Sequence, residues 1–126
     1  MQRQTSQRVA IEDVMVAEGR PLGPREIFDL AREQVPSLNL ATVYRTVKRM
    51  VEDETIATVE LPGEPPRYEL QSVAAQHHHH FQCRECNAVY DLKKGCVKGL
   101  NALLPEGFRM TGHDIVLYGT CEACGG

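Results

Sequence analysis

Four consecutive histidines stand directly before a Cys-x-x-Cys pair in the segment HHHHFQCREC, residues 77–86. The chain of 126 residues has only five histidines and five cysteines, so this segment and a second Cys-x-x-Cys pair near the C-terminus hold most of them. Imidazole and thiolate groups are the usual ligands of zinc in proteins. The pattern therefore predicts metal binding; a solvated polyhistidine run or a tag is the weaker interpretation, because the tract is internal and abuts a cysteine pair.

The two cysteine pairs together supply four thiolates, which is the ligand set of a closed, tetrahedral structural zinc site. The four residues are Cys83, Cys86, Cys121 and Cys124. The N-terminus is polar and shows no export signal, and no apolar run is long enough to span a membrane, so we expect a cytoplasmic protein without a membrane partner. In that reducing compartment a disulfide framework is disfavoured, and a thioredoxin-type dithiol lacks its βαβ context.

Catalysis by a zinc hydrolase would require an open coordination position and a carboxylate base, as in His-Glu-x-x-His. The sequence has no such motif, and we expect no enzymatic activity. A zinc-ribbon adaptor that does not bind DNA would explain the cysteines and stays an alternative.

The histidine tract can serve two metal sites at once. In an extended segment alternate side chains face opposite sides, so His78 and His80 point one way while His77 and His79 point the other. The sequence therefore predicts one site on each side of this strand.

Two groups of elements can position these ligands. In the second half, strand-like runs at 80–83 and 88–92 flank the first cysteine pair, a helix is predicted near 96–104, and the strand-like run 114–120 precedes the second pair. In the first half, helices are predicted over 6–18, from Pro24 and from Leu40, and strand-like runs at 55–61 and 66–70 follow. The fold class is thus α+β, with a winged helix-turn-helix domain at 1–70, a hinge at 71–76 and a small α/β metal-binding domain at 77–126.

The helix that begins after Asn39 has the face of a DNA-reading helix. Asn39 is the predicted N-cap, and Arg45 and Arg49 lie almost opposite the apolar stripe of this helix. The residues that flank them carry phenol, ammonium and hydroxyl groups and no carboxylate; they are Thr42, Tyr44, Thr46 and Lys48. Residues 1–51 carry a net charge of +2 and residues 52–126 of −5, so the first half is the better partner for an anionic polymer. A solvated basic surface remains the alternative, but the hairpin that follows has the position of a wing.

With these motifs in place, the chain resembles the ferric uptake regulator superfamily of metal-responsive repressors nearly end to end. The similar segments are RQTSQR, LATVYRTVKRMVE, HHHHFQCRECNAVYDL and HDIVLYGTCEAC. The resemblance implies a winged-helix domain joined to an α/β dimerisation domain with structural zinc, a homodimer, and binding to double-stranded operator DNA that depends on a sensed divalent metal. A peroxide-sensing or iron-sensing member of the family is the alternative to a zinc-uptake-type regulator.

The resemblance also implies roles for individual residues. A sensory metal between the domains would be bound by Glu69, His78, His80 and Asp91 and would clamp the hinge. An additional site would use His77, His79, His113 and, by a gapped alignment, Cys96. DNA would be contacted by Tyr44 and Arg45 at bases, by Thr42, Lys48 and Arg49 at base edges or backbone, and by Arg3 in the minor groove.

One departure bears on the metal. Where many iron and peroxide sensors of the family have a histidine, this chain has Arg20, which cannot ligate a metal. This counts against the peroxide-sensing branch. A thiolate from Cys96 beside three imidazoles would favour Zn²⁺ over Fe²⁺ or Mn²⁺ as the second metal. A free, half-buried cysteine at position 96 is the alternative.

Overall fold

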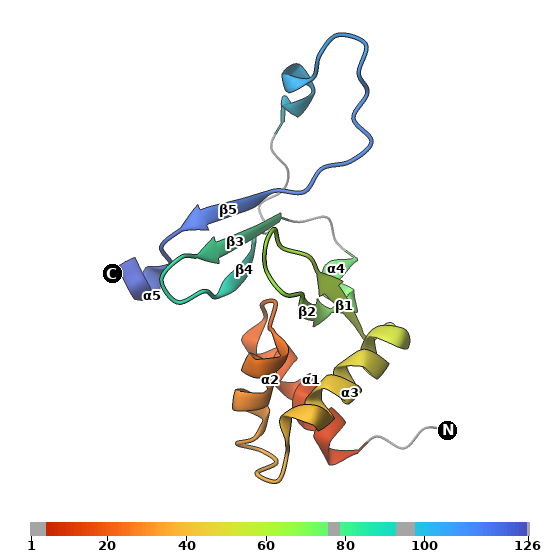
Figure 1. The fold of residues 1–126 in the computed structure, drawn as a ribbon, viewed down its shortest axis with the longest axis vertical. Helices are drawn as coiled ribbons and strands as arrows, with labels where there is room; N and C mark the ends of the chain where they lie inside the picture. The colour runs from red at the N-terminus through yellow and green to blue at the C-terminus, as the bar shows by residue number, and fades with distance from the viewer. Residues whose placement is uncertain (1–4, 76–78, 93–97, 126) are drawn as a thin grey trace. The chain divides into compact units, whose positions relative to one another are not determined.

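The computed structural model describes residues 5–75, 79–92 and 98–125 and divides the chain into two compact units, Met1–Gln76 and His77–Gly126. Each unit is described by itself. The elements of the N-terminal unit are α1 (Ser6–Glu18), α2 (Pro24–Ala31), α3 (Leu40–Glu52), β1 (Ile56–Val59), β2 (Arg67–Leu70) and α4 (Gln71–Ala74). Those of the C-terminal unit are β3 (His79–Cys83), β4 (Val89–Leu92), the 3-10 helix η1 (Leu100–Leu103), β5 (Val116–Gly119) and α5 (Glu122–Gly125) (Figure 1). The predicted α+β class is confirmed.

Local capping interactions fix the ends of the first and third helices. The Thr5 side chain accepts a hydrogen bond from the Arg8 N–H at the start of α1, and Gly19 ends this helix at a positive φ of 62°. At the start of α3, Asn39 Oδ1 accepts a hydrogen bond of 2.8 Å from the Thr42 N–H, which confirms the predicted N-cap. Such caps satisfy backbone donors that have no partner inside the helix.

The three helices enclose one apolar core. Their inward residues are fully or almost fully buried together with residues of the first turn and strand: Ala10, Ile11, Met15, Leu22, Ile27, Ala31, Leu38, Val43, Val47, Met50 and Ile56. On α3, Val43, Val47 and Met50 recur at helical spacing, so the opposite face of this helix is left for solvent. The core thus determines which face of α3 is exposed.

An antiparallel hairpin follows α3, as expected for a wing. β1 pairs with β2 in a register that places Ile56 opposite Leu70 and Ala57 opposite Glu69. An isolated bridge joins Leu22, in the turn between α1 and α2, to Tyr68 on β2. The hairpin is therefore attached both to the end of α3 and to the corner between the first two helices (Figure 1).

The segment after β2, where the hinge is predicted at 71–76, contains a turn of helix. Residues Gln71–Ala74 form the single turn of α4, with a hydrogen bond of 2.9 Å from the Ala75 N–H to the Gln71 carbonyl. The four residues of this turn include only one larger apolar side chain, Val73, so they carry no periodic apolar signal by which a sequence pattern could reveal it. The domain limits at 70 and 77 stay predictions.

The C-terminal unit contains a three-stranded sheet in the order β4-β3-β5. β3 pairs antiparallel with β4 and parallel with β5. The predicted helix near 96–104 is seen only as the 3-10 turn η1, and residues 93–97 lie outside the described ranges. Gly99 directly precedes this turn and has a positive φ of 86°. A residue with a side chain would be strained in that backbone conformation. Among the described residues no helix is long and apolar enough to cross a membrane.

Candidate metal centre and nucleic-acid interface

The sheet of the C-terminal unit brings the two cysteine pairs together. Cys83 ends β3, and the parallel pairing of β3 with β5 delivers Cys121 and Cys124 beside it, because Cys83 is paired with Gly119. All four Sγ atoms lie within 4.8 Å of one another, and Cys86 Sγ lies 3.8 Å from Cys121 Sγ. None of these four cysteines is in a disulfide.

This spacing fits a zinc ion. Four sulfurs placed tetrahedrally at about 2.3 Å from Zn²⁺ lie about 3.8 Å apart, which matches the separation of Cys86 Sγ and Cys121 Sγ. A disulfide would require a separation of about 2.05 Å. The geometry therefore agrees with the predicted structural zinc site, which Cys83, Cys86, Cys121 and Cys124 would hold.

Backbone N–H groups stabilise the thiolate form of Cys83. The Cys86 N–H and the Cys121 N–H point at Cys83 Sγ at 3.5 and 3.4 Å. These donors lower the pKa of Cys83 to about 6, whereas the neighbouring sulfurs of Cys121 and Cys86 raise the pKa of Cys124 to about 12. A backbone hydrogen bond from Cys124 also lowers the pKa of Cys121, so the protein groups favour the thiolate form at Cys83 and Cys121 and oppose it at Cys124, where a bound cation would favour it.

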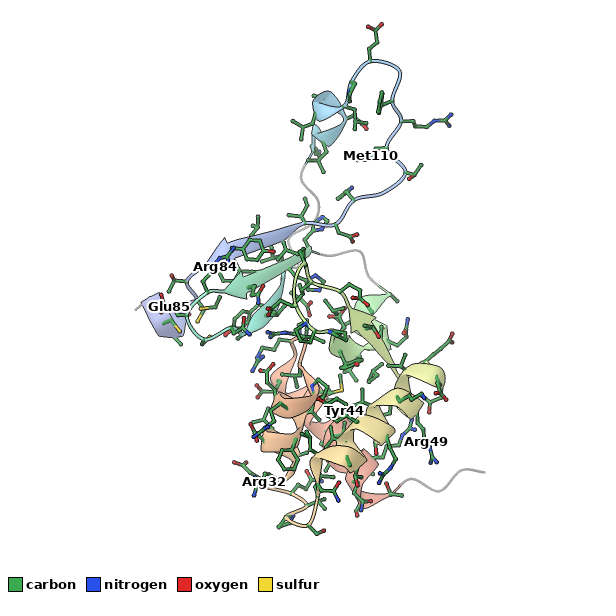
Figure 2. The ribbon with its side chains drawn as sticks, viewed as in Figure 1. Arg32, Tyr44, Arg49, Arg84, Glu85 and Met110 are labelled. Atoms are coloured by element: carbon green, nitrogen blue, oxygen red, sulfur yellow. The ribbon has the colours of Figure 1, made fainter. Side chains whose placement is uncertain are left out.

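Two contacts that the sequence pattern does not predict brace the first cysteine turn. The Gln82 side chain donates a hydrogen bond of 2.6 Å to Asn87 Oδ1, and Asn87 adopts a positive φ of 66°. The Arg84 guanidinium lies over the Tyr118 ring at 4.2 Å from its centroid, which connects the turn to β5. Arg84 is labelled beside Glu85 in Figure 2. An asparagine just after Cys-x-x-Cys was the available sequence signal, because asparagine tolerates positive φ.

A second group of ligand-type residues lies on β3 and β4. His80 and Asp91 are cross-strand partners, and His80 Nε2 lies 3.2 Å from Asp91 Oδ1. The Asp91 side chain is only 2% exposed and that of His80 is 16% exposed. A buried carboxylate next to an imidazole is a donor pair that suits zinc, ferrous iron or manganese. The structure thus brings together two of the four residues predicted for the sensory metal.

The other two predicted sensory ligands are not in this pair. Glu69 belongs to the N-terminal unit, where it lies on β2 opposite Ala57. His78 lies outside the described residues. Arg20, the departure from the family pattern that the resemblance indicates, forms ion pairs with Glu18 and Glu26 at 3.1 and 3.0 Å.

His79 contacts a different partner from that of His80. Its buried imidazole lies against the ring of His113, with 5.0 Å between the ring centroids and an angle of 36° between the ring planes. His79 and His113 are two of the four residues predicted for the additional metal site, and the structure brings them together. The other two, His77 and Cys96, lie outside the described residues.

The exposed face of α3 carries the predicted DNA-contacting side chains. Tyr44 is 54% exposed, and Arg45, Lys48 and Arg49 are also exposed. Thr42 is half-buried and its hydroxyl accepts a hydrogen bond of 3.1 Å from Arg45 Nη2. Figure 2 labels Tyr44 and Arg49 on this helix. Arg3 lies outside the described residues. Donors on one exposed helix face are what major-groove reading requires.

Comparison with known proteins agrees with the family resemblance of the sequence. The profile of the ferric uptake regulator family matches residues 2–118. The ferric uptake regulation protein of Bacillus subtilis strain 168 is 29% identical over 99% of this chain and 83% of its own length, and that of Campylobacter jejuni is 28% identical over 95% and 78%.

Solved structures show the same architecture. A zinc-bound manganese uptake regulator superimposes with a TM-score of 0.78 at 26% identity, covering 95% of this chain and 91% of its own. The iron-bound ferric uptake regulator of Francisella tularensis gives a TM-score of 0.71 at 25% identity, covering 99% and 96%. Members of this family are metal-responsive regulators of transcription and not enzymes, as the sequence predicts. The chain belongs to the ferric uptake regulator family.

Proposed function

We propose that this chain is a homodimeric, DNA-binding transcriptional repressor whose affinity for its operator depends on a divalent metal. The observation that carries the proposal is the pair of His80 and Asp91, which offers a half-buried imidazole and a buried carboxylate 3.2 Å apart in a chain whose other unit is a winged helix. A zinc-ribbon adaptor would need the cysteine cluster but not this second donor pair or the basic face of α3.

In this proposal the sensed metal acts as a clamp at the hinge. His78, His80 and Asp91 would bind it from the C-terminal unit, and Glu69 would bind it from the wing strand β2. Binding would select the arrangement of the two units that allows the recognition helices of a dimer to reach one duplex. The four residues would hold the metal, which would link the two units, and the basic face of α3 would meet the DNA.

Dimerisation through the C-terminal unit is supported by what that unit exposes. Large apolar side chains are open to solvent there, namely Tyr90, Leu103, Phe108, Leu117 and Tyr118. Within the described residues β5 pairs with β3 alone, which leaves one strand edge without a partner. Exposed apolar area and an open strand edge are features that a second copy would cover.

The roles proposed for single residues follow the sequence prediction. Tyr44 and Arg45 would read bases, Lys48 and Arg49 would hold the backbone with Thr42, and Arg3 would enter the minor groove. The second metal is proposed to be Zn²⁺ if Cys96 joins His77, His79 and His113, and Fe²⁺ or Mn²⁺ are the alternatives. The structures named above were solved with zinc or with iron, so similarity leaves this choice open.

The test is metal-dependent binding to a duplex selected from a random library with the purified protein. Binding should require Zn²⁺, Fe²⁺ or Mn²⁺ and should be lost with a chelator that leaves the four-cysteine zinc in place. Asp91→Asn should abolish metal activation without unfolding the protein, whereas Asp114→Asn, an exposed carboxylate of the same unit, should not. Equal affinity with and without metal would contradict the proposal.

A further inference from the structure

The wing is tied to the corner between α1 and α2 by ion pairs that share one carboxylate, that of Glu26. Glu26 Oε2 lies 3.0 Å from Arg20 Nη1, and Glu26 Oε1 lies 3.4 Å from Arg67 Nη1. The same Oε1 accepts a hydrogen bond of 3.2 Å from the Gly23 N–H at the start of α2. We call this ion-pair cluster, together with the neighbouring backbone pairing of Leu22 with Tyr68, the corner–wing joint. Its residues are Arg20, Leu22, Glu26, Arg67 and Tyr68.

The arginines of the joint are far less exposed than ordinary surface cations. The side chain of Arg67 is 8% exposed and that of Arg20 is 17% exposed. By contrast, the ion pair of Arg25 and Asp29 on α2 spans 3.9 Å between side chains that are 74% and 58% exposed. Removing the shared carboxylate would leave one buried and one half-buried cation with one carboxylate partner fewer each, which costs more than losing a solvated pair.

Backbone hydrogen bonds make the same connection beside the ion pairs. The Leu22 N–H donates to the Tyr68 carbonyl at 2.9 Å, and the Tyr68 N–H donates to the Leu22 carbonyl at 2.8 Å. Arg67 and Tyr68 directly precede Glu69 on β2. If Glu69 is displaced, the neighbouring residues Arg67 and Tyr68 are therefore displaced with it, and these two residues are bonded to the corner.

The corner in turn is packed into the helix core. Leu22 and Ile27 are fully buried with Val43 and Val47, which lie on the inner face of α3. Because packed cores transmit displacement with little compression, we expect a displacement of the corner to reach α3. The path from Glu69 to the DNA-reading face thus lies wholly within the N-terminal unit.

We propose that Glu26 is a positioning residue for metal-dependent DNA binding: it makes β2 and the α1–α2 corner one rigid body, so that a metal bound at Glu69 moves the recognition helix. The inference rests on the proposed function, in which Glu69 is a ligand. In this proposal Arg20 has a structural role at a position where it cannot bind a metal. Its guanidinium joins the corner to the carboxylate that holds the wing, and this connection needs no metal.

Hydrogen exchange of the metal-free protein tests the joint without DNA or sensory metal. Glu26→Gln keeps an oxygen for the Gly23 N–H but removes the charge, and exchange at the Leu22 and Tyr68 amides should become about tenfold faster. Asp29→Asn, which removes an exposed carboxylate from the same helix, should leave both amides unchanged. The proposed joint would be wrong if Glu26→Gln left the exchange rates of the Leu22 and Tyr68 amides unchanged. It would also be wrong if the exchange rates of the β1–β2 amides and of α3 rose by the same factor.

Metal response tests transmission. In Glu26→Gln, and independently in Arg67→Gln, the ratio of operator affinities with and without Zn²⁺ should shrink about tenfold while the Zn²⁺ affinity, measured by chelator competition, stays within about twofold of wild type. Arg20→Lys, which keeps the charge, should retain most of the ratio. An unchanged ratio in both variants would overturn transmission. A wild-type protein without any metal response would contradict the proposed function, whereas the exchange experiment would still decide the joint.

Discussion

Loss of one thiolate of the cysteine cluster should unfold the C-terminal unit and leave the N-terminal unit folded. The reason is the uneven distribution of the core. Among the described residues, the buried hydrophobic set contains thirteen members of the N-terminal unit but only Cys83, Ala88 and Val89 of the C-terminal one. A unit with so little apolar burial depends on another source of stability.

The magnitude follows from the size of the unit. At roughly 0.05–0.15 kcal/mol per residue, a segment the length of His77–Gly126 would have a total stability of about 2.5–7.5 kcal/mol. Structural zinc contributes an apparent ~10–16 kcal/mol in small zinc-binding peptides near neutral pH. The expected contribution of the metal therefore exceeds the whole stability of the unit.

Calorimetry of Cys124→Ser beside wild type measures this directly. The variant should lose the thermal transition of the C-terminal unit and keep that of the N-terminal unit, and it should no longer form the proposed dimer. Glu85→Gln, an exposed residue inside the first Cys-x-x-Cys turn, is the matched control and should melt like wild type. A Cys124→Ser protein that keeps wild-type zinc content, dimer and melting would refute the reasoning.

Three further outcomes are expected. Arg45→Ala should weaken operator binding by ~1–3 kcal/mol and relax specificity, whereas Lys48→Ala should lower the salt slope by about one; unchanged binding of Arg45→Ala would show that the reading face is misassigned. Hydrogen bonding from Thr55, with help from Arg8, holds the pKa of Asp53 below its usual 3.8, so Asp53 stabilises the fold above about pH 4 and this contribution is lost as the pH falls through the lowered value; Asp53→Asn should lower the melting temperature at pH 7 but not in strong acid. Cys96→Ser in cobalt-substituted protein should remove thiolate charge-transfer absorption from the additional site while the four-cysteine signal persists, and an unaltered spectrum and stoichiometry would exclude Cys96 as a ligand.

The helices of the N-terminal unit could be predicted because each has a periodic apolar stripe and a terminal signal. Asn39 before Leu40 and Gly19 after α1 are such signals, and both act in the structure as caps. The two Cys-x-x-Cys pairs are similarly local. Their meeting is not local: it requires β5 to lie parallel to β3, and no pattern within either strand specifies that neighbour.

The corner–wing joint shows a second limit. Glu26 and Arg67 are 41 positions apart in the chain, and their contact depends on how the hairpin folds back on the α1–α2 corner. Charged residues at such separations give no periodic signal, so the sequence reveals that Arg20 cannot ligate a metal but not what it binds instead. The structure supplies that partner.

The histidine tract illustrates how much a register adds to a pattern. Alternation along an extended strand predicts that neighbouring histidines face opposite sides, and this much needs only the sequence. The β3–β4 register then sets Asp91 opposite His80, while His79, one residue earlier, meets His113. A shift of one residue in this register would move Asp91 away from His80, so the pairing of β3 with β4 decides which imidazole meets the carboxylate, whereas His113 reaches His79 from the segment before β5. In the proposed metal sites, the donor set on each side of β3 would therefore depend on strand register as well as on the identity of the ligands.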